Sequence, residues 1–295
     1  MPDHPQPGRL PAVSFFSVSA VFHYLGPSLA VLLFARLDVL GVTWLRLASA
    51  ALVFAVWRRP WRHIRSLSTR SRVTLLALGA VLALMNTVFY LAVARLPLST
   101  VGAIEFGGTV ILATAGARTG RNAAALVLTT GGVLAITAIR LAGHPLGFVF
   151  AFANCALFVL YIVLGHRIAA AGTDAGGAGA PSGIDRLGGA MGVAAVVATP
   201  WGLGGALPAF TRPFLLLAGA GVGVCSSVIP YVTDQLAMAR LPRATFSLML
   251  ALLPVFAVII GALVLHQRPT WRDLLGIALV AAGVALHHGC ETEGN

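Results

Sequence analysis

The sequence carries little charge for its length. Only 10% of its 295 residues are charged, whereas a soluble domain carries roughly 25%. Lysine is absent, so the net charge of +11 comes entirely from arginine. These arginines lie mostly in short segments between apolar runs, which argues against nucleic acid as a partner. A chain with so few polar side chains cannot cover itself with a water-compatible surface, and this excludes an ordinary soluble protein.

Sites for bound groups and for covalent chemistry are also scarce. The three cysteines, Cys155, Cys225 and Cys290, form no CxxC pair and no zinc-ligand spacing, so neither a disulfide framework nor a metal site is expected. The GxxxxGK[ST] phosphate loop is missing, as are HExxH, paired-Asp and GxSxG arrangements inside the apolar runs. We therefore expect no cofactor, no ATP-driven transport and no enzymatic activity, with a lipid-modifying membrane enzyme as the weakest alternative.

Long apolar runs fill most of the chain. Hydrophobic residues make up 58% of the sequence, and the mean hydropathy is +0.90. A helix of about 20 residues spans the ~30 Å hydrocarbon layer, and continuous runs favour helices over the alternating strands of a membrane barrel. We predict an all-α polytopic protein of the inner (cytoplasmic) membrane with ten transmembrane helices. The predicted spans are 12–34, 39–57, 73–94, 98–117, 122–140, 146–165, 187–206, 214–238, 243–265 and 270–288.

The distribution of arginine predicts an orientation. The segment after the second span is the most basic one and contains Arg58, Arg59, Arg62, Arg65, Arg70 and Arg72. If this segment is cytoplasmic, thirteen of the twenty arginines lie on the cytoplasmic side and six on the other. The positive-inside rule and an even number of spans then place both termini in the cytoplasm.

A short motif occurs twice. Residues 92–100 (AVARLPLST) return 145 positions later at 237–245 (AMARLPRAT), with six of nine positions identical. The first copy follows the third predicted span and the second follows the eighth, on opposite sides of the membrane. This predicts two inverted five-helix repeats, 1–145 and 146–288, followed by a short polar tail, 289–295. Many secondary transporters are built in this way, with a binding site near the midplane between the repeats.

Several segments resemble a known family in their order and spacing. They are 41–47 (GVTWLRL), 85–91 (MNTVFYL), 104–108 (IEFGG) and 229–231 (IPY), followed by Arg240-Leu241-Pro242. Together they resemble the drug/metabolite transporter superfamily, and within it the EamA-type threonine/homoserine exporter branch, over about residues 12–288. The resemblance implies a ten-helix fold of inverted repeats and export of amino acids or related metabolites in exchange for protons.

Two positions depart from that branch. Thr109 stands where the branch tends to have proline after the Glu-Phe pair, and Leu253 stands where it often has glutamate before the proline of the ninth span. Loss of an acidic residue inside the membrane would alter the substrate or the coupling ion, so threonine and homoserine are not assigned as the substrates here.

Three ionisable residues inside the predicted spans are candidates for function, because ionisable groups in a bilayer are costly and usually face a cavity or a partner. Glu105 in the fourth span is a candidate proton carrier, since desolvation disfavours its charged form. Arg46 in the second span either binds a substrate carboxylate or pairs with Glu105. His23 lies near Pro27, which kinks its helix. Because histidine side chains in general change charge near neutral pH, His23 is the second proton-coupling candidate, the alternative being a structural histidine.

Polar residues at helical spacing predict a lined cavity. Asn86 and Tyr90 share one face of the third span, and Tyr231 and Gln235 repeat this spacing exactly 145 residues later. Asn154 and Tyr161 in the sixth span complete the predicted substrate-binding set, the alternative being hydrogen bonds between helices. Asp234, near the end of the eighth span, is predicted to be a solvated or Arg240-paired residue at the rim.

The expected function is proton-coupled export of a small amino acid or related metabolite by alternating access. A carrier for amphipathic drugs or toxic metabolites is the nearest alternative, and Trp44, Phe89 and Phe106 leave it open. A passive channel is the less favoured alternative. The expected partners are the substrate, protons and the lipid bilayer. Glycine pairs such as Gly276 and Gly283 are explained by packing within the chain, with a homodimer through the last span as an alternative.

Overall fold

The computed structural model of the chain describes residues 12–64, 67–114, 120–137, 144–173, 182–241, 246, 250 and 253–291. Its regular elements in this part are all helical. They are α1 (Ala12–Leu33), α2 (Val39–Arg58), α3 (Trp61–Ile64), α4 (Thr69–Val93), α5 (Leu98–Thr114), α6 (Gly120–Thr137), α7 (Pro145–Thr173), α8 (Gly183–Phe210), α9 (Pro213–Gly223), the π-helical turn η1 (Val224–Val228), α10 (Ile229–Met238), α12 (Leu253–Leu265) and α13 (Trp271–Glu291).

Six stretches of helix are long and apolar enough to cross a membrane, which supports the prediction of an all-helical membrane protein. They are Phe15–Leu33, Val39–Arg58, Thr69–Val93, Pro145–Ala170, Gly183–Phe210 and the continuous stretch Pro213–Met238. The count of ten spans stays a prediction. Several helices run beyond the predicted limits, and α13 continues to Glu291, so residues 289–291 extend a helix, whereas residues 292–295 lie outside the described part.

Local sequence signals account for two of the helix starts. Asp38 precedes α2, and its carboxylate accepts hydrogen bonds from the backbone N–H groups of Leu40 and Gly41, which otherwise have no partner at a helix start. Ser182 and Asp185 form a capping box at the start of α8. Arg58 at the end of α2 donates to Asp185 Oδ1 at 2.8 Å, and this contact joins α2 to α8.

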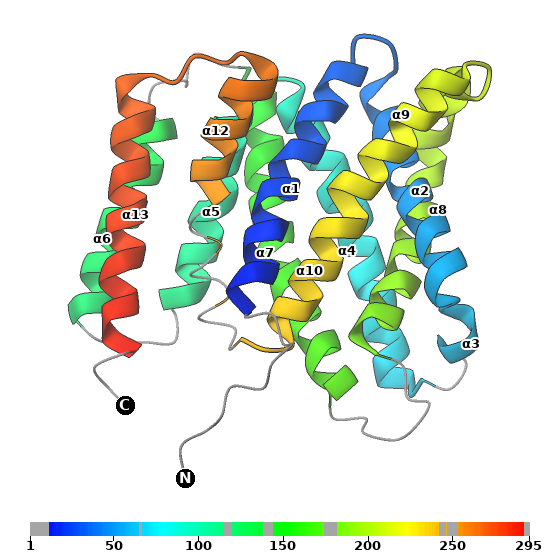
Figure 1. Ribbon diagram of the computed structural model, residues 1–295, viewed down its shortest axis with the longest axis horizontal. Helices are drawn as coiled ribbons and strands as arrows, with labels where there is room; N and C mark the ends of the chain where they lie inside the picture. The colour runs from blue at the N-terminus through cyan, green and yellow to red at the C-terminus, as the bar shows by residue number, and fades with distance from the viewer. Residues whose placement is uncertain are drawn as a thin grey trace.

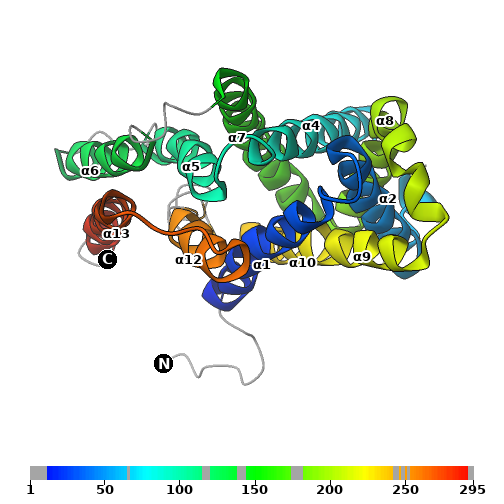
Figure 2. The same cartoon turned by 90° about the horizontal axis from the view of Figure 1, so that it is seen from above.

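The helices alternate in direction, and the start of α1 and the end of α13 lie at the same face of the molecule (Figure 1). Seen from above, α6 and α13 pack together at one end, and α2, α8 and α9 lie at the other (Figure 2). Between them, α1 packs against α10 and α12, and α7 packs against α4 and α5. Helices from the first and second halves of the chain are therefore neighbours throughout.

Close approach of helices depends on glycine at two positions. A Cβ at Gly26 of α1 would lie 2.2 Å from Ser226 Oγ and 2.7 Å from Ser226 Cα, and a Cβ at Gly41 of α2 would lie 2.2 Å from the backbone of Gly205 in α8. Such distances leave no room for a methyl group, so α1 meets η1, and α2 meets α8, only because these residues lack a side chain.

Gly26→Ala is expected to destabilise the protein by about 1–3 kcal/mol, the usual cost of overpacking a filled interior. The reason is that backbone atoms of Ser226, and not only a flexible side chain, stand in the way. Thermal unfolding in detergent would measure the change. Gly192→Ala is the matched control, because a Cβ at helical Gly192 meets nothing within 4 Å. Equal unfolding temperatures for both variants would contradict the assigned contact.

Candidate functional site

A small polar cavity lies where six helices meet. Its volume is about 10 Å³, room for about one water molecule. Its walls come from α1, α2, α4, α5, α7 and α10, so both halves of the chain contribute. The lining residues are His23, Pro27, Arg46, Met85, Asn86, Phe89, Glu105, Asn154 and Tyr231.

Glu105 is the acidic group of this cavity and is 2% exposed. Its Oε1 accepts a hydrogen bond from Asn154 Nδ2 at 3.2 Å and lies 4.0 Å from His23 Nε2, and its Oε2 accepts from the Tyr24 hydroxyl at 3.4 Å. Asn154 Oδ1 is buried and has no protein partner among the described residues. The carboxylate and this amide oxygen together supply acceptors to the cavity.

Arg46 is the basic group of the cavity and is 4% exposed. Its Nη2 donates to the carbonyl oxygen of Ser226 at 2.7 Å, and its Nε donates to Ser227 Oγ at 2.8 Å. The Ser226 carbonyl is free for this bond because the residue four positions later is Pro230, which has no N–H to donate. Thus the π-helical turn before Pro230 holds the guanidinium in place.

The predicted alternative of an ion pair between Arg46 and Glu105 is wrong. Within the described part of the chain, Arg58 forms an ion pair with Asp185, and His23 Nε2 lies 4.0 Å from Glu105 Oε1, a contact that is an ion pair only when His23 is protonated. Arg46 is instead held by the serines of η1, and its guanidinium lies 5.1 Å from the ring centre of Tyr90. An arginine and a carboxylate therefore share one cavity without neutralising each other by contact.

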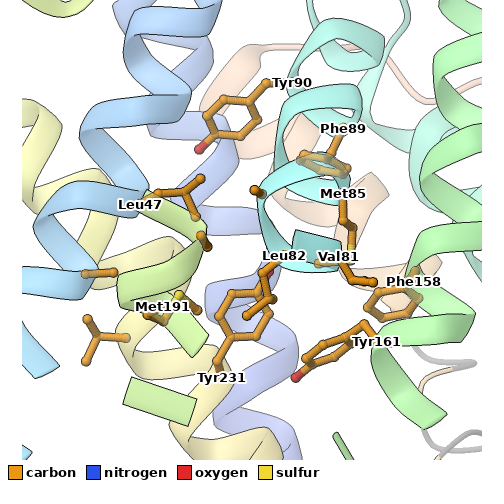
Figure 3. Close-up of a cluster of buried hydrophobic side chains, with 14 of the residues drawn as sticks. Leu47, Val81, Leu82, Met85, Phe89, Tyr90, Phe158, Tyr161, Met191 and Tyr231 are labelled. Carbon is orange, nitrogen blue, oxygen red and sulfur yellow. The ribbon is translucent and has the colours of Figure 1, made fainter. Parts of the chain in front are cut away.

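Asn86 and Tyr231 meet across the centre of the protein. Asn86 Nδ2 donates to the Tyr231 hydroxyl at 3.3 Å, and the two residues are 145 positions apart. The ring of Tyr161 lies 5.3 Å from that of Tyr231. Figure 3 shows these two tyrosines at one end of a buried cluster, with Tyr90 at the other end. Polar groups of α4, α7 and α10 thus meet inside an otherwise apolar core.

The structure brings six of the nine predicted site residues to the cavity wall: His23, Arg46, Asn86, Glu105, Asn154 and Tyr231. The other three are buried nearby and do not line it. Tyr90 contacts Arg46, Tyr161 donates to Asp234, and Gln235 lies 3.5 Å from the Gly165 carbonyl. Tyr90 and Gln235 are each one helical turn beyond Asn86 and Tyr231, which carries them past so small a space.

The prediction for Asp234 was wrong. Asp234 is 1% exposed, and it accepts hydrogen bonds from Ser19 on α1 and from Tyr161 on α7. It forms no ion pair with Arg240, whose guanidinium donates to the Leu236 carbonyl. The sequence places Asp234 near the end of its helix, but α1 and α7 cover this end of α10, and only the packing of distant helices could reveal that.

Other residues of the site were not predicted, although weak signals existed for some. Met85 precedes Asn86 and Phe89 follows it by three residues, so both lie at the border of the helix face that carries Asn86. Tyr24 follows His23 directly, and Ser226 and Ser227 precede the proline of α10. No group of three His, Cys, Asp or Glu side chains in the described ranges is placed to hold a metal ion.

Comparison with known proteins identifies the family of the chain. The chain is 30% identical to the threonine/homoserine exporter RhtA of Salmonella typhimurium (strain SL1344) over 266 residues, which is 88% of this chain and 85% of the relative. RhtA of Escherichia coli K12 is also 30% identical, over 267 residues and the same shares of the two chains. Residues 145–287 match the EamA-like transporter family. The chain belongs to this family.

As a member of the EamA-like transporter family, the chain is a membrane transporter and not an enzyme. The predicted resemblance to the drug/metabolite transporter superfamily is confirmed. A solved crystal structure covers 93% of this chain and 96% of its own, with a TM-score of 0.61 at 16% identity. At that identity the likeness concerns the fold alone.

Proposed function

We propose that this EamA-like transporter is a proton-coupled secondary exporter of small amino acids or closely related metabolites in the inner membrane. The observation that carries the proposal is the presence of Arg46 and Glu105 in one cavity with no ion pair between them. A free amino acid carries one carboxylate and one ammonium group, and this cavity offers a partner for each. The export direction and the substrate class follow the relatives, which are threonine/homoserine exporters.

Arg46 is the group that binds the substrate carboxylate. Its Nε and Nη2 are held by Ser227 and Ser226, while Nη1 has no bond to a described residue and belongs to a side chain of the cavity wall. A guanidinium fixed in this way loses little further side-chain entropy on binding an anion.

Glu105 is the group that binds either the substrate ammonium or a proton. An ionised Glu105 and Asn154 Oδ1 together accept hydrogen bonds from an ammonium group, whereas a protonated Glu105 is neutral and cannot form this charge-assisted bond. Because one carboxyl group serves both ligands, binding of one favours release of the other. This competition gives exchange of substrate for protons.

Alternating access accounts for the small size of the cavity. A space of about 10 Å³ is too small for an amino acid, so the cavity must widen before a substrate can bind. Substrate entry requires helices of the two halves to separate on one side of the cavity, because both halves form its wall.

Two inverted five-helix repeats, 1–145 and 146–288, provide the moving halves. In the two repeats, α1 is equivalent to α7, α4 to α9–α10, and α5 to α12. The contact of α1 with α10 is therefore equivalent to the contact of α7 with α4, and both are present. The contact of α1 with α12 is likewise equivalent to the contact of α7 with α5. Asn86 and Tyr231, 145 positions apart, bond directly to each other, as expected for equivalent positions close to a two-fold axis.

The repeated Arg-Leu-Pro motif supports the same relation. Arg95 donates to the carbonyl four residues earlier and lies 5.3 Å from the ring centre of Phe150, near the start of α7. Arg240 makes the same backbone bond and lies 4.8 Å from the ring centre of Phe15, near the start of α1. The two turns lie at opposite faces of the molecule (Figure 1).

The orientation and the assembly complete the proposal. The excess of arginine after α2 supports a cytoplasmic location for the face with the start of α1 and the end of α13. Within the chain α13 packs against α6, and a homodimer through α13 would use its remaining surface.

Proton flux in proteoliposomes tests the proposed function. Purified protein in liposomes with a pH gradient and a pH-sensitive dye is challenged with a panel of amino acids. We expect saturable, substrate-dependent proton movement with at least one small neutral amino acid, and counterflow of labelled substrate, which a passive channel does not show. Absence of proton movement with every amino acid would contradict the assigned substrate class.

Efflux of amphipathic compounds is the second candidate function. Met85 and Phe89 line the cavity, and flexible methionine and aromatic side chains suit varied apolar ligands. A competition binding panel separates the two candidates: amino acids displace one another from an amino-acid exporter, whereas only lipophilic cations or drugs would do so in a drug carrier.

A further inference from the structure

Asp234 is a second buried carboxyl group, distinct from the cavity wall. It is 1% exposed and does not line the cavity. One of its oxygens accepts a hydrogen bond from Ser19 on α1, and Oδ2 accepts from the Tyr161 hydroxyl on α7 at 3.1 Å. No arginine among the described residues pairs with it. Burial of an ionised carboxylate without a cationic partner costs desolvation free energy, and uptake of a proton by Asp234 removes this cost.

On α1, His23 lies beside Glu105, and Ser19, one helical turn earlier, bonds Asp234. His23 Nε2 is 4.0 Å from Glu105 Oε1, and α1, which carries His23, packs against α10, which carries Asp234. Ser19, which bonds Asp234, is four residues before His23 and therefore on the same face of α1. The three titratable groups form a row that leads from α10 across α1 to α5.

We propose that Asp234 is a second proton-binding group of this transporter and that His23 transfers the proton between Asp234 and Glu105. This inference rests on the proposed proton coupling and extends it. In the transfer step, protonated Asp234 gives its proton to one ring nitrogen of neutral His23. The proton on the other ring nitrogen passes to ionised Glu105. His23 ends neutral, Asp234 ends ionised and Glu105 ends protonated, so charge and protons balance.

Ser19 can serve both protonation states of Asp234. Its hydroxyl bonds the Asp234 carboxylate and also lies 3.3 Å from the carbonyl oxygen of Pro230. When Asp234 is ionised, Ser19 donates to it. When Asp234 is protonated, its O–H donates to Ser19 Oγ, whose own hydrogen turns to the Pro230 carbonyl. Asp234 and Ser19 therefore have hydrogen-bond partners in both protonation states of Asp234. An aspartate with a purely structural role would need partners in one protonation state only.

The surroundings of Asp234 contain few other charges. The titratable groups that face it are His23 on α1, Tyr161 on α7 and Tyr231 one turn earlier on α10. Two further elements pack against α10. Of these, α8 carries Asp185, which is bonded to Arg58, and Arg186 near its start, and η1 carries Cys225. His23 is thus the basic group through which protonation of Asp234 and of Glu105 is linked.

The row also has a direction. Ser19 lies one helical turn, about 6 Å, closer than His23 to the start of α1, and α10 runs toward the same face (Figure 1). Asp234 therefore stands between Glu105 and the face where α1 begins. Opening of that face would expose Asp234 before Glu105, so protons would pass between the cavity and that face by way of His23 and Asp234, and release of a proton from Glu105 to that face is the transfer step in reverse.

The Asp234→Asn variant tests the proposal in proteoliposomes. Asparagine has the same shape, and its groups can still bond Ser19 and the Tyr161 hydroxyl. We expect substrate-dependent proton flux to fall by about tenfold or more, within the usual range of coupling between sites. Counterflow of labelled substrate should persist because Asp234 does not line the cavity, and Asp234→Glu should recover part of the proton flux. Asp38→Asn, the same change at an exposed helix cap, is the matched control.

Two results would overturn the proposal: unchanged proton flux in Asp234→Asn, or loss of counterflow together with flux and no recovery in Asp234→Glu. Infrared difference spectra across a pH titration give a readout that needs no substrate. We expect two titrating carboxyl C=O bands, one lost in Asp234→Asn and the other shifted; an unchanged spectrum would also overturn it. If the unmodified protein moves no protons with any amino acid, the proposed function fails while the spectra still decide the role of Asp234.

Discussion

Glu105→Gln is expected to abolish proton-driven transport while substrate exchange stays measurable. Glutamine keeps an oxygen that accepts from Asn154 and has the same size, so the cavity is preserved, but it cannot bind a proton. The substrate ammonium then loses a charge-assisted hydrogen bond and keeps a neutral one, which we expect to raise the Kd by about tenfold.

Two assays on one proteoliposome preparation measure the effect. Dye-reported proton flux should fall to the level of protein-free liposomes, whereas counterflow of labelled substrate should continue at higher substrate concentration. Asp38→Asn removes a carboxylate from the exposed cap of α2 and should behave as the unmodified protein. A Glu105→Gln variant that still transports against a gradient in response to pH would refute the role of Glu105.

Arg46→Lys is expected to weaken amino-acid binding by about 10- to 100-fold. Lysine keeps the positive charge, but a single ammonium group cannot bond Ser226, Ser227 and a ligand in the fixed geometry of the guanidinium. Loss of one charge-assisted hydrogen bond costs about 1.5–3 kcal/mol, which corresponds to this range of affinity.

Ligands of matched structure make this test specific. An amino acid should lose affinity for Arg46→Lys, whereas the corresponding amine without a carboxylate should bind both proteins equally weakly. Arg95→Lys is the control, because Arg95 is exposed and bonds a helix carbonyl away from the cavity. Equal losses for the acid and the amine would show that Arg46 supports the fold of η1 and does not contact the substrate.

The sequence could indicate those site residues whose position follows from the periodicity of a single helix. Asn86 on α4 and Tyr231 on α10 were predicted from helical spacing and the 145-residue repeat, and both line the cavity. Tyr90 lies on the same helix face as Asn86, and Gln235 on the same face as Tyr231, yet both lie one turn further along the helix axis and do not line the cavity. Helical periodicity indicates which side of a helix a residue occupies, but it does not indicate the depth at which another helix crosses.

Asp234 and Arg46 illustrate the second limit. Asp234 was predicted to be at the rim because it is near the end of its helix, but Ser19 and Tyr161 from two other helices enclose it. Arg46 was predicted either to bind substrate or to pair with Glu105, and its observed partners are the serines of η1. The environments of Asp234 and of Arg46 depend on contacts between residues more than 70 positions apart, and local sequence patterns contain no signal for such contacts.

The sequence by itself determined that this is a helical membrane protein, because hydropathy and helix length depend only on consecutive residues, and the order and spacing of its short motifs gave the resemblance to the drug/metabolite transporter superfamily. It also indicated most of the ionisable and polar side chains that are buried in those helices, although not Asp234. Only the tertiary structure decided which of them meet in one cavity, that Arg46 and Glu105 form no ion pair with each other, and that Ser19 and Tyr161 enclose Asp234. Helix crossings and tilts set these distances, and they result from packing of the whole chain at once.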